Sequence, residues 1–164
     1  MYSRLVNRFS ATRAGSFVVK HVASKVDPVL FRWSKGRITS TGKPTLPMLA
    51  LTTTGARSGQ PRVVQLAYHA DGDDLLVVAS AMGQARHPAW RYNLDAHPNV
   101  RVLVRGDEYA ATATPLGWEE RARLWDAIAT TIPQMRVYEQ RTDREIQVYR
   151  LRRRSDTAGD RISP

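Results

Sequence analysis

The residues with the clearest chemical potential lie in the turn from Thr54 to Gly59, with Arg62 shortly after it. Two glycines, Gly55 and Gly59, let the backbone adopt left-handed conformations, so successive amide hydrogens can converge on an anion. Arg57 lies inside the turn, and Arg62 is near enough across a hairpin to bring a second guanidinium to the same oxyanion. The pattern predicts a site for a phosphate or a carboxylate, although a solvated hairpin turn has the same composition.

The cysteine and histidine content of the sequence excludes several kinds of chemistry. The chain has no cysteine, so disulfides, thiolate metal sites and cysteine nucleophiles are ruled out. Its four histidines are scattered without a paired metal-ligand spacing, and we expect no metal. No catalytic triad is recognisable.

Two strands must hold the anion-binding turn. Met48 to Thr54 is a short apolar and Thr-rich run, and Val63 to Ala70 resumes as a strand, so the two form a hairpin. Four further strands are expected at Leu75 to Ala79, Val100 to Val104, Tyr109 to Thr114 and Glu145 to Leu151.

Helices are expected between these strands. A short helix follows Pro88 and ends before Pro98. A longer helix starts at Pro115 and ends at Pro133, while Met135 to Gln140 is ambiguous. The longer helix should bury one face made by Trp118, Ala122, Trp125 and Ala129.

These elements predict an α+β, mainly β fold. About six antiparallel strands with short hairpins favour a small closed sheet with flanking helices, because closure removes exposed edges. A dinucleotide-binding Rossmann fold is not favoured, since no G-x-G-x-x-G run opens a helix after a strand.

Charge divides the chain unevenly. Residues 1–43 hold nine Lys or Arg against one acid, a net charge of +8, and residues 44–164 contribute only +2. We interpret residues 1–43 as a basic helical arm, 44–152 as the folded body and 153–164 as a polar tail. An apolar stripe in the arm favours an anionic membrane surface or the protein's own barrel as its partner; without a recognisable reading element, nucleic acid is not favoured.

The run from Leu51 to Val63 resembles the signature of the deazaflavin-dependent nitroreductase family. The resemblance continues through Asp71-Gly72, Val77 to Ser80, Pro88 to Trp90 and Ala96 to Val100, with the family spacings kept, and covers roughly residues 46–151. It implies a split β-barrel oxidoreductase that binds the 8-hydroxy-5-deazaflavin coenzyme F420 and transfers hydride from its reduced form.

The resemblance also implies which residues contact the coenzyme. The implied cofactor-binding positions are Ala56, Arg57, Ser58, Arg62, Val63, Val64, Gln65, Leu66, Ala67, Val78, Ala79, Ser80, Ala81, Ala89, Trp90, Arg91, Tyr92 and Asn93. Ser80 and Tyr138 match positions on the substrate side and are the implied catalytic residues. Ser80 can equally be a strand-end hydroxyl bonded to backbone, and Trp90 can equally be helix core.

The chain departs from family members that reduce nitroimidazoles. Those members are aromatic at the positions of Ile132 and Met135, and they often carry a basic residue and a proline where this chain has Ala81 and Gln65. We therefore expect a cytoplasmic reductase, at or near the inner face of the cell membrane, that passes hydride to a small apolar quinone or enone, with nitro compounds as a further candidate. The alternatives are an FMN-binding barrel oxidoreductase and a non-catalytic protein that binds F420.

Overall fold

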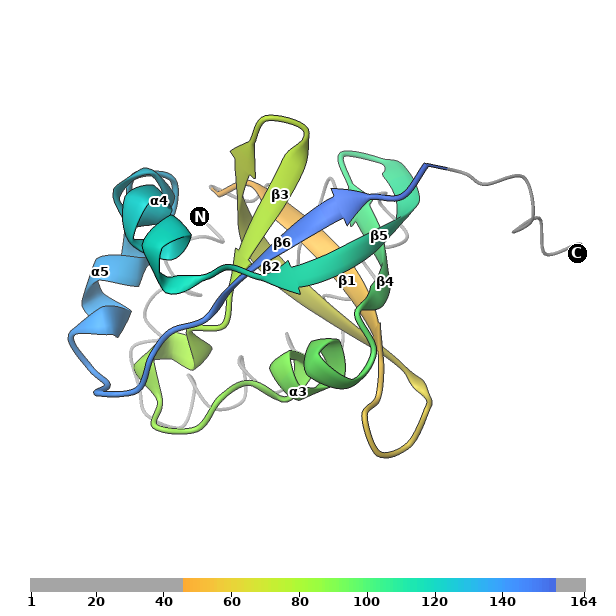
Figure 1. Cartoon of the computed structure of the whole chain (residues 1–164), viewed down its shortest axis with the longest axis horizontal. Helices are drawn as coiled ribbons and strands as arrows, with labels where there is room; N and C mark the ends of the chain where they lie inside the picture. The colour runs from red at the N-terminus through yellow and green to blue at the C-terminus, as the bar shows by residue number, and fades with distance from the viewer. Residues whose placement is uncertain (1–45, 156–164) are drawn as a thin grey trace, which may run out of the picture.

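The computed structural model describes residues 46–155. Six antiparallel strands form one closed barrel in the order β1-β2-β3-β6-β5-β4 (Figure 1). The strands are β1 (Met48–Thr54), β2 (Pro61–Asp71), β3 (Asp74–Val78), β4 (Asn99–Val104), β5 (Asp107–Pro115) and β6 (Val148–Arg153). The helices are η1 (Ala81–Gly83), α3 (Ala89–Ala96), α4 (Trp118–Thr131) and α5 (Gln134–Glu139). The expected mainly β fold of about six strands with flanking helices is confirmed, whereas the arm, residues 1–43, and residues 156–164 of the tail lie outside the described range.

Two pairings that are distant in sequence close the barrel. Strand β1 pairs with β4, and β3 pairs with β6 from Val78↔Val148 to Leu75↔Leu151. The hairpin between β2 and β3 turns tightly at Gly72, whose φ of +60° suits a residue without a Cβ. No strand of the barrel is left with an unpaired edge.

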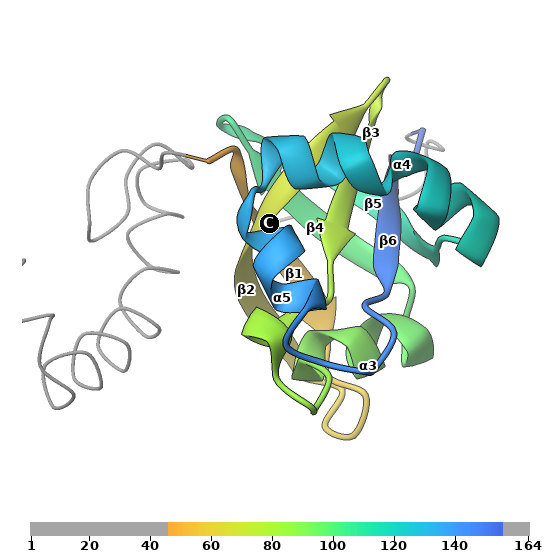
Figure 2. The ribbon, with the colours of Figure 1, turned by 90° about the vertical axis from the view of Figure 1, so that its left-hand side faces the viewer.

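The hydrophobic core has two parts, and β3 contributes to both. Leu75 and Val77 point into the barrel, whereas Leu76 and Val78 face the layer of α4 and α5. Alternate residues of a strand face opposite sides, so a strand buried on both faces is apolar throughout. Figure 2 shows α4 lying across the outside of the barrel, over β3 and past β6, with α5 beside α4.

Helix α3 covers one end of the barrel. Trp90 and Leu94 of this helix belong to the interior core, and the Trp90 ring meets the Tyr149 ring edge-on with centroids 5.9 Å apart. In Figure 1, α3 lies at the lower end of the strands, close to the loop that joins β1 to β2. The interior core thereby fixes α3 relative to that loop.

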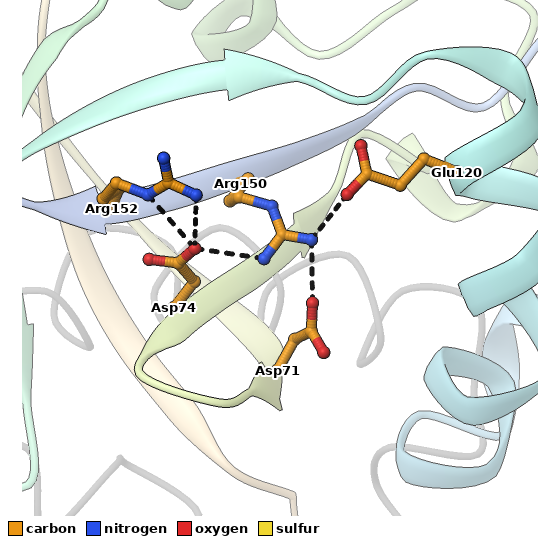
Figure 3. A network of polar contacts seen from close by, with 5 residues as sticks. All are labelled: Asp71, Asp74, Glu120, Arg150 and Arg152. Carbon is orange, nitrogen blue, oxygen red and sulfur yellow. Dashed lines mark hydrogen bonds and ion pairs between the residues drawn. The ribbon is translucent and has the colours of Figure 1, made fainter.

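An ion network holds the end of the barrel away from α3. Arg150 of β6 donates to Asp71 at 2.7 Å, to Asp74 at 3.1 Å and to Glu120 of α4 at 2.7 Å (Figure 3). Burial works against the charge of Arg150, but hydrogen bonds from these carboxylates raise its pKa above its ordinary value. One guanidinium therefore ties the β2–β3 hairpin to both β6 and α4.

Three sequence-based predictions are wrong: one about the buried face of α4 and two about where α4 and β6 begin. Trp118 is 73% exposed and Ala122 is also exposed, whereas Trp125 and Ala129 are buried as expected. Trp118 lies on the same side of α4 as Trp125, but the first turn of the helix projects beyond β6 in Figure 2 and has no sheet to cover.

Two boundaries also differ from expectation. Pro115 ends β5, paired with Tyr149, so α4 begins three residues later at Trp118. Strand β6 begins at Val148, not at Glu145, because its partner β3 ends opposite that residue. The ambiguous segment after Pro133 is the short helix α5.

Candidate functional site

The loop between β1 and β2 is closed by its own backbone. The Gly55 amide donates to the Gln60 carbonyl at 2.9 Å, and the Gly59 amide donates to the Gly55 carbonyl at 2.8 Å. Gly59 has a φ of +65°, in the left-handed region. Gly55 does not adopt the left-handed conformation that the sequence predicts for it, but a Cβ there would lie 2.5 Å from Ser58 Oγ and 3.2 Å from the Gln60 carbonyl oxygen, so a larger residue would require the Ser58 side chain to move.

The tip of this loop presents cations and amides without partners. Within residues 46–155, no hydrogen bond is made by the backbone amides of Arg57 and Ser58. Arg57 and Arg62 are exposed, and neither forms an ion pair with a described residue. Unpaired amides beside two uncompensated guanidiniums are the features of an anion site.

Asn93 of α3 holds the loop in place. Its Oδ1 accepts from the Ala56 amide at 2.9 Å, and its Nδ2 donates to Thr53 Oγ1 at 3.0 Å. Thr53 Oγ1 in turn donates to the Arg62 carbonyl at 3.2 Å. Asn93 is 9% exposed and Thr53 2%, so these bonds are shielded from water, and breaking them would leave polar groups without partners.

A pocket of about 710 Å³ opens between this loop, the start of β2 and α3. It is lined by Thr53, Gly55, Ala56, Arg57, Ser58, Arg62, Val63, Val64, Ala89, Trp90, Tyr92 and Asn93. No carboxylate is among these described lining residues, and valine, alanine and aromatic side chains form much of the wall. The pocket therefore combines an apolar wall with a cationic rim, which suits a flat, largely apolar ring system attached to an anionic chain.

Ten of the implied cofactor-binding residues line this pocket. They are Ala56, Arg57, Ser58, Arg62, Val63, Val64, Ala89, Trp90, Tyr92 and Asn93. Trp90 is 7% exposed and belongs to the interior core, so it is both helix core and pocket wall. Tyr92 is 50% exposed at the pocket rim, and His87 meets its ring edge-on.

The other implied residues lie outside the lining of this pocket. Gln65, Leu66 and Ala67 continue β2 away from it, and the Leu66 side chain packs against the interior core. The Arg91 side chain pairs with Asp95 at 3.5 Å. Val78 to Ala81 form the end of β3 and the turn that follows.

The two implied catalytic residues lie near the contact between η1 and α5. Ser80 is 9% exposed, and its hydroxyl makes no hydrogen bond to a described residue. Tyr138 is half-buried against the outer core, with the Arg141 guanidinium 5.8 Å from the centre of its ring. Its backbone carbonyl approaches Gly83, where an added Cβ would lie 3.0 Å away.

The sequence-based prediction assigns no contact with the coenzyme to two kinds of residue in this region. Thr53 and Gly55 lie in the recognised run, yet only the folded chain shows that they line the pocket. Arg144 lies in an irregular segment before β6 and donates to the carbonyls of Ala79, Ser80 and Gln84. No local motif marks such an arginine, because these three carbonyls are 60 or more residues away in the sequence.

A closed antiparallel barrel with an apolar pocket and a cationic, amide-lined loop belongs to the class of split-barrel oxidoreductases that bind a cofactor at the barrel surface. Comparison with known proteins narrows the class. A family model described as F420H2-dependent quinone reductase matches residues 26–152. The chain belongs to this family, which confirms the resemblance to deazaflavin-dependent reductases, and it is an oxidoreductase that depends on reduced coenzyme F420.

Similar proteins agree with this assignment. The F420H2-dependent quinone reductase Rv1261c of Mycobacterium tuberculosis is 37% identical over 133 residues, which is 79% of this chain and 89% of the relative. The structure of the F420H2-dependent reductase FDR-A has 35% identity and a TM-score of 0.60, covering 64% of this chain and 93% of its own. A structure described as a domain-swapped dimer has 32% identity and a TM-score of 0.61, covering 77% of this chain and 96% of its own.

Proposed function

We propose that this protein binds F420H2 in the pocket between the β1–β2 loop and α3, and that it transfers the hydride to a small apolar acceptor, a quinone or a related enone, placed beside the turn that carries Ser80. The main support for this proposal is that one pocket contains both Arg57 and Arg62, which form no ion pair with a described residue, and an apolar wall that includes Trp90. The phosphate and carboxylates of the coenzyme suit the guanidiniums and the unpaired amides. The apolar wall suits the deazaflavin ring and the acceptor.

When bound, F420H2 supplies the hydride. The protein's own residues bind, orient and exclude water, because the chemistry of such enzymes belongs to the cofactor. Arg57, Arg62 and the amides of Arg57 and Ser58 would hold the anionic chain. Val63, Val64 and Trp90 would wall the ring, and Asn93 would keep the loop and α3 in register.

Reduction of a quinone to a hydroquinone also requires a proton. We assign its supply to the Tyr138 hydroxyl, with the Ser80 hydroxyl as a hydrogen-bond donor to the acceptor. A Tyr138→Phe variant should then bind the coenzyme as the wild type does but show a lower kcat. An unchanged kcat would remove Tyr138 from this role.

A coenzyme titration tests the proposal. Purified protein should quench or shift deazaflavin fluorescence with micromolar affinity, and should oxidise F420H2 in the presence of menadione. An Arg57→Ala, Arg62→Ala double variant should lose affinity by roughly 100-fold or more, since each of the two charge-assisted hydrogen bonds contributes about 1.5–3 kcal/mol. An Arg123→Ala variant, which alters an exposed arginine of α4, is the matched control.

Two other results would support the alternatives. A clear response to FMN with none to F420 would favour the FMN-binding oxidoreductase. Normal F420 binding with equal oxidation rates in the wild type and the double variant would favour a non-catalytic F420-binding protein.

We expect nitro compounds to be poorer acceptors than quinones. Ile132 and Met135 are 2% and 6% exposed and pack in the outer core, so neither contributes an aromatic surface to an acceptor. Comparing kcat/KM for menadione and for a nitroimidazole tests this expectation. A higher value for the nitroimidazole would contradict it.

An apolar quinone acceptor also bears on where in the cell the protein is located. We propose that the basic arm, residues 1–43, attaches the protein peripherally to an anionic membrane on the cytoplasmic side. No helix within residues 46–155 is long and apolar enough to cross a membrane. Sedimentation with anionic liposomes should be lost when the arm is removed, and steeply salt-dependent DNA binding by the arm would instead favour nucleic acid.

A further inference from the structure

The turn after β3 has an unusual backbone. Ala81, Met82 and Gly83 have φ values of +46°, +58° and +75°, three left-handed residues in succession. Only Gly83 adopts this region without a steric penalty, so the turn needs support from its surroundings. Its own hydrogen bonds run from the Gly83 amide to the Ser80 carbonyl at 2.9 Å and from the Gln84 amide to the Ala81 carbonyl at 3.1 Å.

Arg144 supplies support from outside the turn. Its Nη2 donates to the Ser80 carbonyl at 2.6 Å, and its Nη1 donates to the Ala79 carbonyl at 3.2 Å. Its Nε donates to the Gln84 carbonyl at 2.8 Å. One planar guanidinium therefore holds both ends of the left-handed turn, a span that the single ammonium of lysine cannot reproduce.

The same guanidinium reaches the start of α3. Nη1 of Arg144 lies 3.2 Å from Nδ1 of His87, two residues before that helix. A guanidinium nitrogen cannot accept, so this contact is a hydrogen bond when His87 Nδ1 accepts, which places the ring proton on Nε2. Burial lowers the pKa of His87, with Arg91 and Arg144 lowering it further and Asp95 opposing them, so the neutral ring is favoured.

No carboxylate neutralises Arg144 within the described part of the chain. Its partners are backbone carbonyls and the neutral His87 ring, and burial followed by the nearby Arg91 charge lowers its pKa. Arg150, at the other end of the barrel, is by contrast held by the carboxylates of Asp71, Asp74 and Glu120. Arg144 instead links the turn that carries Ser80 to His87, at the start of the helix that lines the pocket.

We propose that Arg144 is a positioning residue for the reductase reaction, locking the left-handed turn that carries Ser80 and tying this turn through His87 to α3. The inference rests on the proposed function, because the turn and the helix are the acceptor side and the coenzyme side of the same reaction. Arg144 itself contacts neither reactant. It sets the distance and orientation between the groups that contact the coenzyme and the acceptor.

The first experiment uses the coenzyme-free protein. Nitrogen-detected NMR of the wild type should show His87 as the Nε2–H tautomer, and an Arg144→Lys variant should raise the pKa of His87 because the guanidinium no longer donates to Nδ1. Hydrogen exchange at the Gly83 and Gln84 amides should be roughly tenfold faster or more in the variant. An unchanged tautomer, pKa and exchange rate would overturn the inference.

The second experiment measures turnover. Arg144→Lys should lower kcat for menadione by roughly 10- to 100-fold, as expected for misplaced reacting groups, with KM for F420H2 little changed. The acid limb of its pH profile should move to higher pH with the His87 pKa. Arg144→Ala should regain part of its rate when guanidinium is added below denaturing concentrations, a rescue that a loss of folding would not show.

The control is an arginine outside the site whose guanidinium also donates to a backbone carbonyl. Arg121 Nε donates to the Ile146 carbonyl at 2.8 Å, and Arg121→Lys should lower stability while keeping kcat and the pH profile. A wild-type enzyme that turns over while Arg144→Lys keeps full kcat would overturn the inference and leave the proposed function intact. A wild-type protein without turnover would overturn the proposed function and, with it, the role of Arg144 in the reaction. The NMR data would still decide whether Arg144 locks the turn.

Discussion

At the scale of single residues, Asn93 does more than occupy the pocket wall. Its carboxamide accepts from the Ala56 amide and donates to Thr53 Oγ1, using both ends of one side chain. An aspartate has no donor for Thr53, and a leucine has neither group. The loop between β1 and β2 therefore depends on this amide for its position relative to α3.

We predict that Asn93→Asp lowers both stability and coenzyme affinity. The free energy of unfolding should fall by about 1–3 kcal/mol, because Thr53 loses a buried partner and a carboxylate is placed beside the pocket. The added negative charge should weaken F420 binding further. Urea unfolding and the fluorescence titration measure the two effects.

Asn99→Asp is the control for this prediction. Asn99 is exposed at the start of β4, where its side chain accepts a long bond from Thr112. Both quantities should stay near wild-type values in that variant. If Asn93→Asp bound F420 as tightly as Asn99→Asp, the role assigned to the amide would be wrong.

At the scale of elements, α4 shows how a helix can extend past the surface that it covers. Trp125 is 9% exposed, donates from Nε1 to Glu139 at 2.8 Å and lies under the Arg121 guanidinium. Trp118, two turns earlier on the same side, is 73% exposed. The helix packs where β3 and β6 provide an outer face and is solvated where they do not.

The two tryptophans should respond differently to truncation. Trp125→Ala should lower the free energy of unfolding by about 3–5 kcal/mol, since a large buried side chain leaves a cavity. Trp118→Ala should change it by less than about 0.5 kcal/mol, as surface substitutions usually do. Chemical unfolding of both variants measures the difference, and equal losses would mean that Trp118 is covered in solution.

At the scale of the whole molecule, the barrel separates a binding end from an end held by charge. The pocket lies at the end covered by α3, whereas Arg150 connects the β2–β3 hairpin, β6 and α4 at the other end (Figures 1 and 3). Asp71 and Asp74 of the hairpin are paired with arginines of β6 at that other end. Within residues 46–155, the cationic rim of the pocket therefore has no carboxylate paired with it.

The ion network should make stability depend on acid pH. Burial alone would raise the pKa of Asp74, but hydrogen bonds to Arg152 and Arg150 lower it below 3.8. A lowered folded pKa stabilises the fold above the unfolded value of 3.8, and this contribution is lost as pH falls through the folded value.

We therefore expect Asp74→Asn to lower the free energy of unfolding by about 1–3 kcal/mol near neutral pH, with the difference from the wild type shrinking below pH 3.8. Denaturant unfolding across this pH range measures it. Asp73→Asn, which changes an exposed residue in the same turn, should show no such pH dependence. A constant difference at all pH values would contradict the assignment to Asp74.

The sequence alone determined the elements and the chemistry of the loop. Short-range patterns decide these features: the apolar and Thr-rich run of β1, the glycines at Gly55 and Gly59, and the arginines beside them lie within a few residues of each other. They predict a hairpin, and they favour an anion site at its turn, before any packing is known. The family signature in the same run identified the coenzyme, which neither glycines nor arginines can do.

Tertiary structure decided what those residues meet. The Asn93 bond to the loop spans 37 residues and the Arg144 bond to Ser80 spans 64, and no local pattern encodes partners so far apart. Periodicity placed Trp118 and Trp125 on one side of a helix, yet the extent of the sheet beneath them buries only Trp125. Local sequence sets the direction in which a side chain points, whereas closure of the barrel sets whether a partner, a pocket or solvent lies there.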